Sequence, residues 1–174
     1  MSNRETRKAL AFATDREALI RYLLHGQAKL AAHALPPDHW AAEPNVTQYP
    51  YDPARAEQIL AAAGFPRRQD GTRLHLMLKC STDEQARLID AALQEQWRRV
   101  GVQLEVRPLE LATLFSDVAK GNFQHTYQRW VGANTDPDFL NMVSRRSASR
   151  PMARIAGTIA TRVSTRSPTR FAWR

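Results

Sequence analysis

The residues best able to bind or transform a ligand gather in one stretch, Trp130-Val-Gly-Ala-Asn-Thr-Asp-Pro-Asp138. It combines an aromatic ring, an amide and two carboxylates with a glycine that permits a tight turn. Asp136 and Asp138 could act as a general acid and base, or could bond to the local backbone. A solvated turn with a packed tryptophan is the competing interpretation. We take Trp130, Asn134 and Asp136 as the candidate ligand-binding residues.

The sequence offers little else for catalysis or metal binding. The five histidines are scattered, and no pair has the spacing of metal ligands on one helix. A glycine-rich phosphate loop and a nucleophile elbow are both absent from the sequence. The single cysteine, Cys80, is typical of a small buried hydrophobe, because a catalytic thiol would need a positioned base. We therefore expect a protein that is not an enzyme and that uses no metal and no cofactor.

The elements that must position the loop centre on a strand–helix–strand unit. Alternating leucines predict a strand at residues 73–79. From Asp83 to Val100 apolar residues recur every three or four positions, which predicts an amphipathic helix. Alternation resumes at residues 102–108, and the helix is long enough to cross over, so these two strands should be parallel neighbours. A third strand at residues 123–130 leads directly into the candidate loop.

Other helices and a long connection surround this unit. Four prolines exclude continuous helix or central strand between residues 27 and 51, and long loops of this kind are often functional or wrapped over a partner. Helices alternating with strands predict an α/β sheet. The remaining predicted helices cover residues 3–13, 16–24, 54–63 and 110–120.

The net charge of +8 comes from one end of the chain. Residues 144–174 hold eight arginines and no acid; the 25 basic residues minus these eight leave 17, which equals the 17 acidic residues of the remainder. A neutral body with a basic tail can indicate a nucleic-acid arm. A sharp change in residue usage can also indicate a change in how the sequence arose.

Several motifs carry a resemblance to a known family. The segment Arg7-Lys-Ala-Leu-Ala-Phe-Ala-Thr-Asp-Arg-Glu17 resembles the helix pair "R-x-A-x-x-x-A-I-D-R-E". Tyr51-Asp-Pro-Ala-Arg-Ala-Glu-Gln-Ile-Leu-Ala-Ala-Ala-Gly-Phe-Pro66 is similar to "Y-D-P-x-K-A-x-x-L-L-x-x-A-G-Y-P", the most specific match. Trp130 to Phe139 resembles "W-x-x-D-x-x-D-P-D-x-F". All three belong to the family 5 extracellular solute-binding proteins, the dipeptide-, oligopeptide- and nickel-binding proteins of bacterial ABC importers.

This resemblance implies the second lobe of a periplasmic-binding-protein-like (type II) fold, with a small mixed sheet flanked by helices. It implies a substrate-binding component that closes on a small solute, a peptide or another, without chemistry, and that meets an importer permease as a monomer. In peptide-binding relatives an aspartate holds the ligand's amino group; the matching position is Ala133, which leaves open a ligand other than a peptide. The family is periplasmic or at the cell surface, whereas this chain, lacking a signal peptide, is expected to stay cytoplasmic if made as given.

The resemblance divides the chain into residues 1–143, a partial solute-binding domain that is mainly the second lobe, and residues 144–174, a basic tail expected to be poorly ordered. One choice of codons for Met152 to Ser164, read one base earlier, gives Asn-Gly-Ala-Asn-Arg-Gly-His-Tyr-Arg-Asn-Pro-Arg-Val-Asp, which resembles the family's continuation. We therefore predict that the tail is a frameshift product. The alternative function is a nucleic-acid-associated protein that uses the arginine-rich tail, although the body has no recognisable reading motif and no specific nucleic-acid partner is expected.

Overall fold

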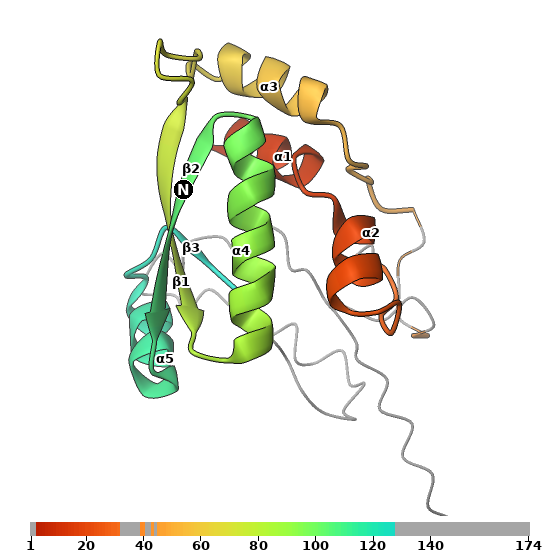
Figure 1. Cartoon of the computed structure of the whole chain (residues 1–174), viewed down its shortest axis with the longest axis vertical. Coiled ribbons are helices and arrows are strands. Elements are labelled where there is room, and N and C mark those ends of the chain that lie inside the picture. Colours follow the sequence, from red (N-terminus) through yellow and green to blue (C-terminus); the bar gives the residue numbers. More distant parts are fainter. Residues whose placement is uncertain (1–2, 32–38, 41–42, 44, 128–174) are drawn as a thin grey trace, which may run out of the picture.

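The computed structural model describes residues 3–31, 39–40, 43 and 45–127. Within them, a parallel β–α–β unit forms the centre of the fold (Figure 1). It consists of β1 (Leu74–Ser81), α4 (Glu84–Arg99) and β2 (Val102–Leu109), and it confirms the predicted unit. The candidate loop and the tail lie outside the described residues.

The β–α–β unit follows from the sequence pattern. Alternate residues of β1 are buried, and the strand pairs in parallel with β2 from Leu74 opposite Val102 to Ser81 opposite Leu109. The Asp83 carboxylate caps α4 by accepting a 3.0 Å hydrogen bond from the Ala86 amide. The turn after α4 requires Gly101, because φ is 83° there and a Cβ would lie 2.9 Å from both the Arg73 side chain and the Gly71 carbonyl oxygen.

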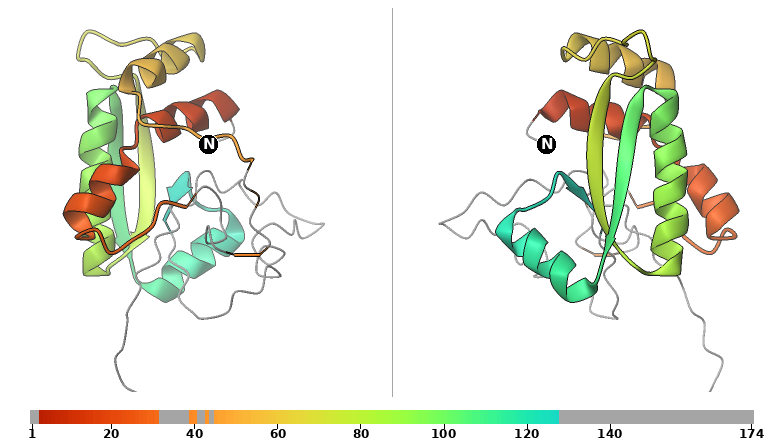
Figure 2. Two further views of the ribbon diagram at one scale, coloured as in Figure 1. Left: turned by 90° about the vertical axis from the view of Figure 1, so that its right-hand side faces the viewer. Right: turned by 60° about the vertical axis from the view of Figure 1, so that its left-hand side comes forward.

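The sheet extends on the other side of β1. Its strand order is β2-β1-β3, and β3 (His125–Thr126) pairs in parallel with Leu78 and Lys79. The expected mixture of strand directions is therefore not found among the described strands, since both pairings are parallel. The reason is that β2 and β3 each follow a crossover helix, which returns the chain to the same end of the sheet. Helix α5 (Leu111–Lys120) makes the second crossover and covers the face opposite α4 (Figure 2).

The helices before β1 pack beside α4 and across the amino end of the sheet (Figures 1 and 2). The helix predicted at residues 16–24 is a short α-helix followed by a π-helical turn that ends at Leu23. Helix α3 begins at Pro53, one residue before the predicted start, and is capped by the Asp52 carboxylate. None of the described helices is both long and apolar enough to cross a membrane. These helices are α1 (Arg4–Phe12), α2 (Arg16–Ala18), η1 (Leu19–Leu23) and α3 (Pro53–Ala62).

One hydrophobic core joins these layers. Trp97 of α4 is buried in it, and its indole Nε1 donates a 2.9 Å hydrogen bond to Thr14 Oγ1. Thr14 in turn donates to the Leu10 carbonyl oxygen at 2.7 Å, so the end of α1 is tied to α4. Its large buried side chains include Leu10, Phe12, Leu19, Leu60, Leu76, Leu78, Ile89, Leu93, Trp97, Val102 and Leu104.

Candidate functional site

The candidate residues Trp130, Asn134 and Asp136 lie outside the described residues, so their assignment as ligand contacts stays a prediction. The structure does describe the place from which that loop departs. Strand β3 pairs with the carboxyl half of β1, so the chain leaves β3 at the carboxyl edge of a parallel sheet. Open α/β sheets bind ligands at that edge. The described residues around β3 are therefore the base of the candidate site.

Lys79 of β1 anchors this base. Its Nζ donates to Asp117 Oδ2 of α5 at 2.7 Å and to the Asn122 carbonyl oxygen at 2.6 Å. The Asn122 amide also donates to Asp117 Oδ1 at 3.1 Å. Hydrogen bonds from Lys79 and then from Asn122 hold the pKa of Asp117 below its usual value. The end of α5 and the approach to β3 are thereby fixed to the central strand.

Side chains also hold β3 on both of its faces. Thr126 Oγ1 donates to the Lys79 carbonyl oxygen at 3.0 Å, and Gln124 Oε1 accepts from the Met77 amide at 2.8 Å. On the other face the His125 ring meets the edge of Trp97, with centroids 5.3 Å apart. Burial lowers the pKa of His125 to about 4, so the ring is neutral at pH 7. Two strand residues are thus positioned by contacts well beyond their backbone pairing.

An exposed apolar pair lies on α5, the helix that begins where β2 ends. Leu111 and Phe115 are 56% and 58% exposed, whereas Leu114 between them is 2% exposed and packs inward. The helical period predicts all three as apolar positions, but it does not show which of them the described chain leaves uncovered. A pair of large apolar side chains at the carboxyl edge can form one wall of a ligand site.

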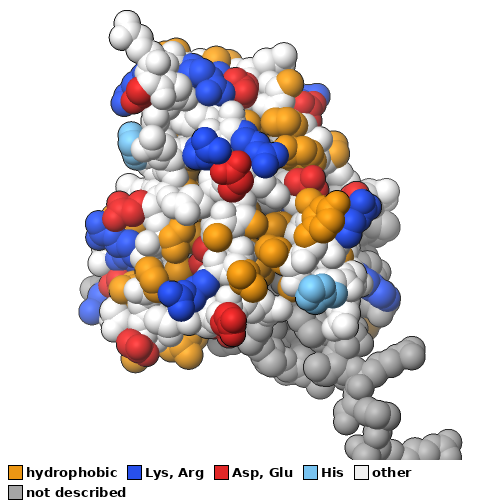
Figure 3. Space-filling view, in the orientation of Figure 1, with side chains coloured by type: hydrophobic (Ala, Val, Ile, Leu, Met, Phe, Trp, Pro, Cys, Tyr) orange, Lys and Arg blue, Asp and Glu red, His pale blue; other side chains and the backbone are white. Residues whose placement is uncertain are grey.

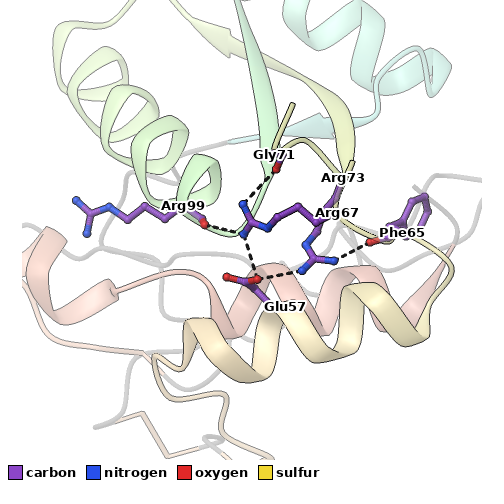
Figure 4. A network of polar contacts seen from close by, with 6 residues as sticks. All are labelled: Glu57, Phe65, Arg67, Gly71, Arg73 and Arg99. Atoms are coloured by element: carbon purple, nitrogen blue, oxygen red, sulfur yellow. Dashed lines mark hydrogen bonds and ion pairs between the residues drawn. The ribbon is translucent and has the colours of Figure 1, made fainter. Parts of the chain in front are cut away.

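The densest charge cluster lies at the opposite, amino end of the sheet (Figure 4). Arg73 is 8% exposed and donates from Nη2 to Glu57 Oε2 at 2.9 Å and from Nη1 to the Phe65 carbonyl oxygen at 3.0 Å. Arg67 contacts the same Glu57 oxygen at 3.0 Å and the Gly71 carbonyl oxygen at 3.2 Å. These contacts are all made within the chain, so this Glu57–Arg73–Arg67 cluster joins α3 to the start of β1.

Metal and thiol chemistry find no support in the part of the chain that the structure describes. There, no three His, Cys, Asp or Glu side chains lie where they could share a metal ion. Cys80 is 0% exposed, which confirms the expected buried hydrophobe, and burial raises the pKa of its thiol to about 12. Figure 3 shows acidic and basic side chains interspersed over the face viewed in Figure 1, as a body without net charge should be.

Comparisons with known proteins agree with this geometry. The family model described as bacterial extracellular solute-binding proteins, family 5, middle, matches residues 1–150. Di/tripeptide-binding protein 1 of Pseudomonas aeruginosa is 28% identical over 134 residues, which cover 77% of this chain and 25% of that protein. Heme-binding protein A of Haemophilus influenzae is 29% identical over 137 residues, with 78% and 25% covered.

A solved structure shows the same fold. The crystal structure of NikA from Brucella suis in complex with Fe(III)-EDTA is 25% identical, with a TM-score of 0.72, and the match covers 81% of this chain and 30% of that one. The chain thus spans about a quarter of the length of the curated relatives it matches.

Proposed function

Because the chain belongs to the bacterial extracellular solute-binding proteins of family 5, we propose that it forms part of the substrate-binding component of an ABC importer. The family is one of non-catalytic binding proteins, and its members are periplasmic. In this role the chain supplies one side of a cleft, holds a small solute there and releases it unchanged to a permease. The solute contacts that we assign are Trp130, Asn134 and Asp136.

The observation that carries the proposal is the fixed position of β3. Its pairing with β1 puts the end of β3 at the carboxyl edge of the sheet, where open α/β sheets bind ligands. The bonds from Lys79 to Asp117 and Asn122 hold that strand from the α5 side, and the His125–Trp97 contact holds it from the α4 side. A loop that leaves a rigid base can present its side chains with little loss of conformational freedom on binding.

The side chains that we assign to this edge also limit which kinds of solute can bind. Asp136 offers a carboxylate to a cation or a hydrogen-bond donor, and Trp130 offers a stacking surface. Leu111 and Phe115 add an exposed apolar wall. Since Ala133 stands where a second carboxylate would hold an amino group, we propose a solute with a broad apolar face and one donor group. The relatives' names include binders of di- and tripeptides and of heme, and both kinds belong in the first ligand panel.

A chimera tests the proposal. Residues 4–143 replace the aligned segment of the Pseudomonas di/tripeptide-binding protein 1, which supplies the rest of a complete binding protein. Calorimetry then measures binding of dipeptides, heme and nickel or iron chelates. We expect Trp130→Ala and Asp136→Asn each to weaken the best solute by roughly tenfold or more, equivalent to about 1.4 kcal/mol.

The matched control is Arg98→Ala, because Arg98 is an exposed residue of α4 whose hydrogen bonds go to Glu95 on the same helix. Its chimera should bind as the parent chimera does. The site assignment is wrong if all three variants fold, by circular dichroism, and bind the solute with the same affinity.

A further inference from the structure

A carboxylic acid lies inside the contact between α4 and the sheet. Asp90 is 1% exposed, in a helix whose other buried residues are Ala86, Ile89, Leu93 and Trp97. Neither of its carboxyl oxygens has a hydrogen-bond partner of good geometry in the described part of the chain. A buried carboxyl with no better partner than a thiol is strongly unfavourable in its ionised form.

The groups that face Asp90 do not supply a cation. From β1 the neighbour is the thiol of Cys80, itself 0% exposed, and β2 presents apolar Val102 and Leu104 to this layer. Arg87, one turn earlier on α4, is exposed and acts on the Cys80 thiol. On β3 the nearest ionisable ring, His125, is neutral and lies against Trp97, two turns further along α4.

Helix α4 can therefore pack against the sheet without a large penalty in free energy only while Asp90 is protonated and neutral. Burial raises the pKa of Asp90, and the nearby Cys80 thiol offsets this in part. Burial, and then the neighbouring Asp90, raises the pKa of the Cys80 thiol as well, so Asp90 disfavours the ionised form of the thiol, whereas the thiol only partly favours the ionised form of Asp90. The pair behaves as two neutral groups closed between a strand and a helix.

We propose that Asp90 is a proton-operated latch between α4 and β1: with its proton it lets the helix close over the strand, and without it the contact loosens and exposes Cys80. The latch is separate from the solute site, so it stands whether or not the proposed function does. It gives the fold a stability that depends on pH through one identified residue.

The direction follows from proton binding. An acid whose pKa is raised by folding binds more protons in the folded state, so the equilibrium constant for opening grows as pH rises. The opening constant begins to grow near pH 3.8, the ordinary pKa of aspartate, and stops growing at the raised pKa of Asp90 in the folded state. Within that window one proton is released on opening, which multiplies the opening constant by about ten per pH unit.

The chain's single cysteine supplies the measurement. The labelling rate of Cys80 by 4,4′-dithiodipyridine is compared between the wild-type chain and Asp90→Asn from pH 4 to pH 9. Taking the ratio of the two rates cancels the reagent's own pH dependence and that of every other titrating group. The control is Glu84→Gln, which removes an exposed carboxylate from the same helix.

We expect the ratio of wild-type to Asp90→Asn labelling to rise by up to about tenfold per pH unit and then level off, with the Glu84→Gln chain following the wild type. A ratio that stays constant over the whole range overturns the latch. Asp90→Ala repeats the comparison if the asparagine variant does not fold. Carbon-13 NMR of the wild-type aspartates is a direct second readout: one carboxyl should keep its proton after the exposed aspartates have lost theirs, and ionisation of all of them together also overturns the proposal.

Discussion

Replacing Glu57 by glutamine should destabilise the chain much more than its position near the surface suggests. Glu57 accepts from Arg73 Nη2 at 2.9 Å and contacts Arg67 Nη2 at 3.0 Å through the same oxygen, Oε2. Arg73 is largely buried, and its Nε already has no partner in the described structure. Glutamine at position 57 offers a neutral amide oxygen in place of the carboxylate, so the buried guanidinium loses its counter-charge and keeps only neutral acceptors such as the Phe65 carbonyl oxygen.

The size of the effect can be worked from these contacts. Breaking a fully buried ion pair costs about 3–5 kcal/mol, and one charge-assisted hydrogen bond contributes about 1.5–3 kcal/mol. The Glu57 side chain is 36% exposed, so water compensates for part of the loss. We expect Glu57→Gln to lower the free energy of unfolding by about 2 kcal/mol, which corresponds to a fall in Tm of roughly 4–8 °C for a chain of this size.

Thermal unfolding followed by circular dichroism at pH 7 measures the change. The matched control is Glu95→Gln, which also removes a carboxylate shared by two arginines, Arg98 and Arg99, but on the exposed side of α4. The control should unfold with the wild type. If the two variants shift Tm equally, the Glu57–Arg73–Arg67 cluster does not join α3 to the sheet in the way the contacts indicate.

Three further predictions concern acid stability, solute binding and the tail. Burial lowers the pKa of His125 from 6.5 to about 4, so the unfolded chain binds a proton that the folded chain does not. His125 should therefore reduce the free energy of unfolding as pH falls from 6.5 towards 4, by roughly 3 kcal/mol in total. In His125→Phe this loss, followed as Tm against pH, should be absent, and a profile identical to the wild type would contradict the prediction. The 174-residue chain alone should bind no peptide or metal complex with a dissociation constant below about 10 μM, because a cleft between lobes buries its ligand on both sides; submicromolar binding in calorimetry would refute this. Sequencing the gene across residues 144–174 should show that another frame encodes the family's continuation, and a gene in which it does not would end the frameshift hypothesis.

Local sequence patterns predict much of the fold. Alternation over residues 73–79 and the three-to-four spacing from Asp83 to Val100 predict the β–α–β unit, and the observed helix and strand ends differ by a residue or two. The same helical spacing also places Asp90 between Ala86 and Leu93 on the inward face, so its burial could have been inferred. The π-helical turn after Ala18 could not, because its apolar residues fit an ordinary helix equally well.

Features that depend on distant contacts were beyond the sequence. The burial of Arg73 requires Glu57 from α3 and the Phe65 carbonyl oxygen, and no local pattern brings these together. The exposure of Leu111 and Phe115 likewise depends on what the rest of the chain leaves uncovered. For the candidate loop, the sequence supplied residue types and a position after a strand, and the structure adds the base from which that loop departs.

The contacts around β3 explain how so short a strand is held in the sheet. In the described structure β3 contributes only His125 and Thr126 to the sheet, too few residues for backbone pairing alone to fix a direction. The missing constraint comes from side chains of neighbouring elements: Lys79 binds the segment that leads into the strand, and Trp97 packs against its inner face. Because these contacts join β3 to elements whose own packing is set by the core, the direction in which the chain leaves β3 depends on the stability of the β–α–β unit. The proposed proton on Asp90 acts on that same unit, so pH and core packing are physically linked.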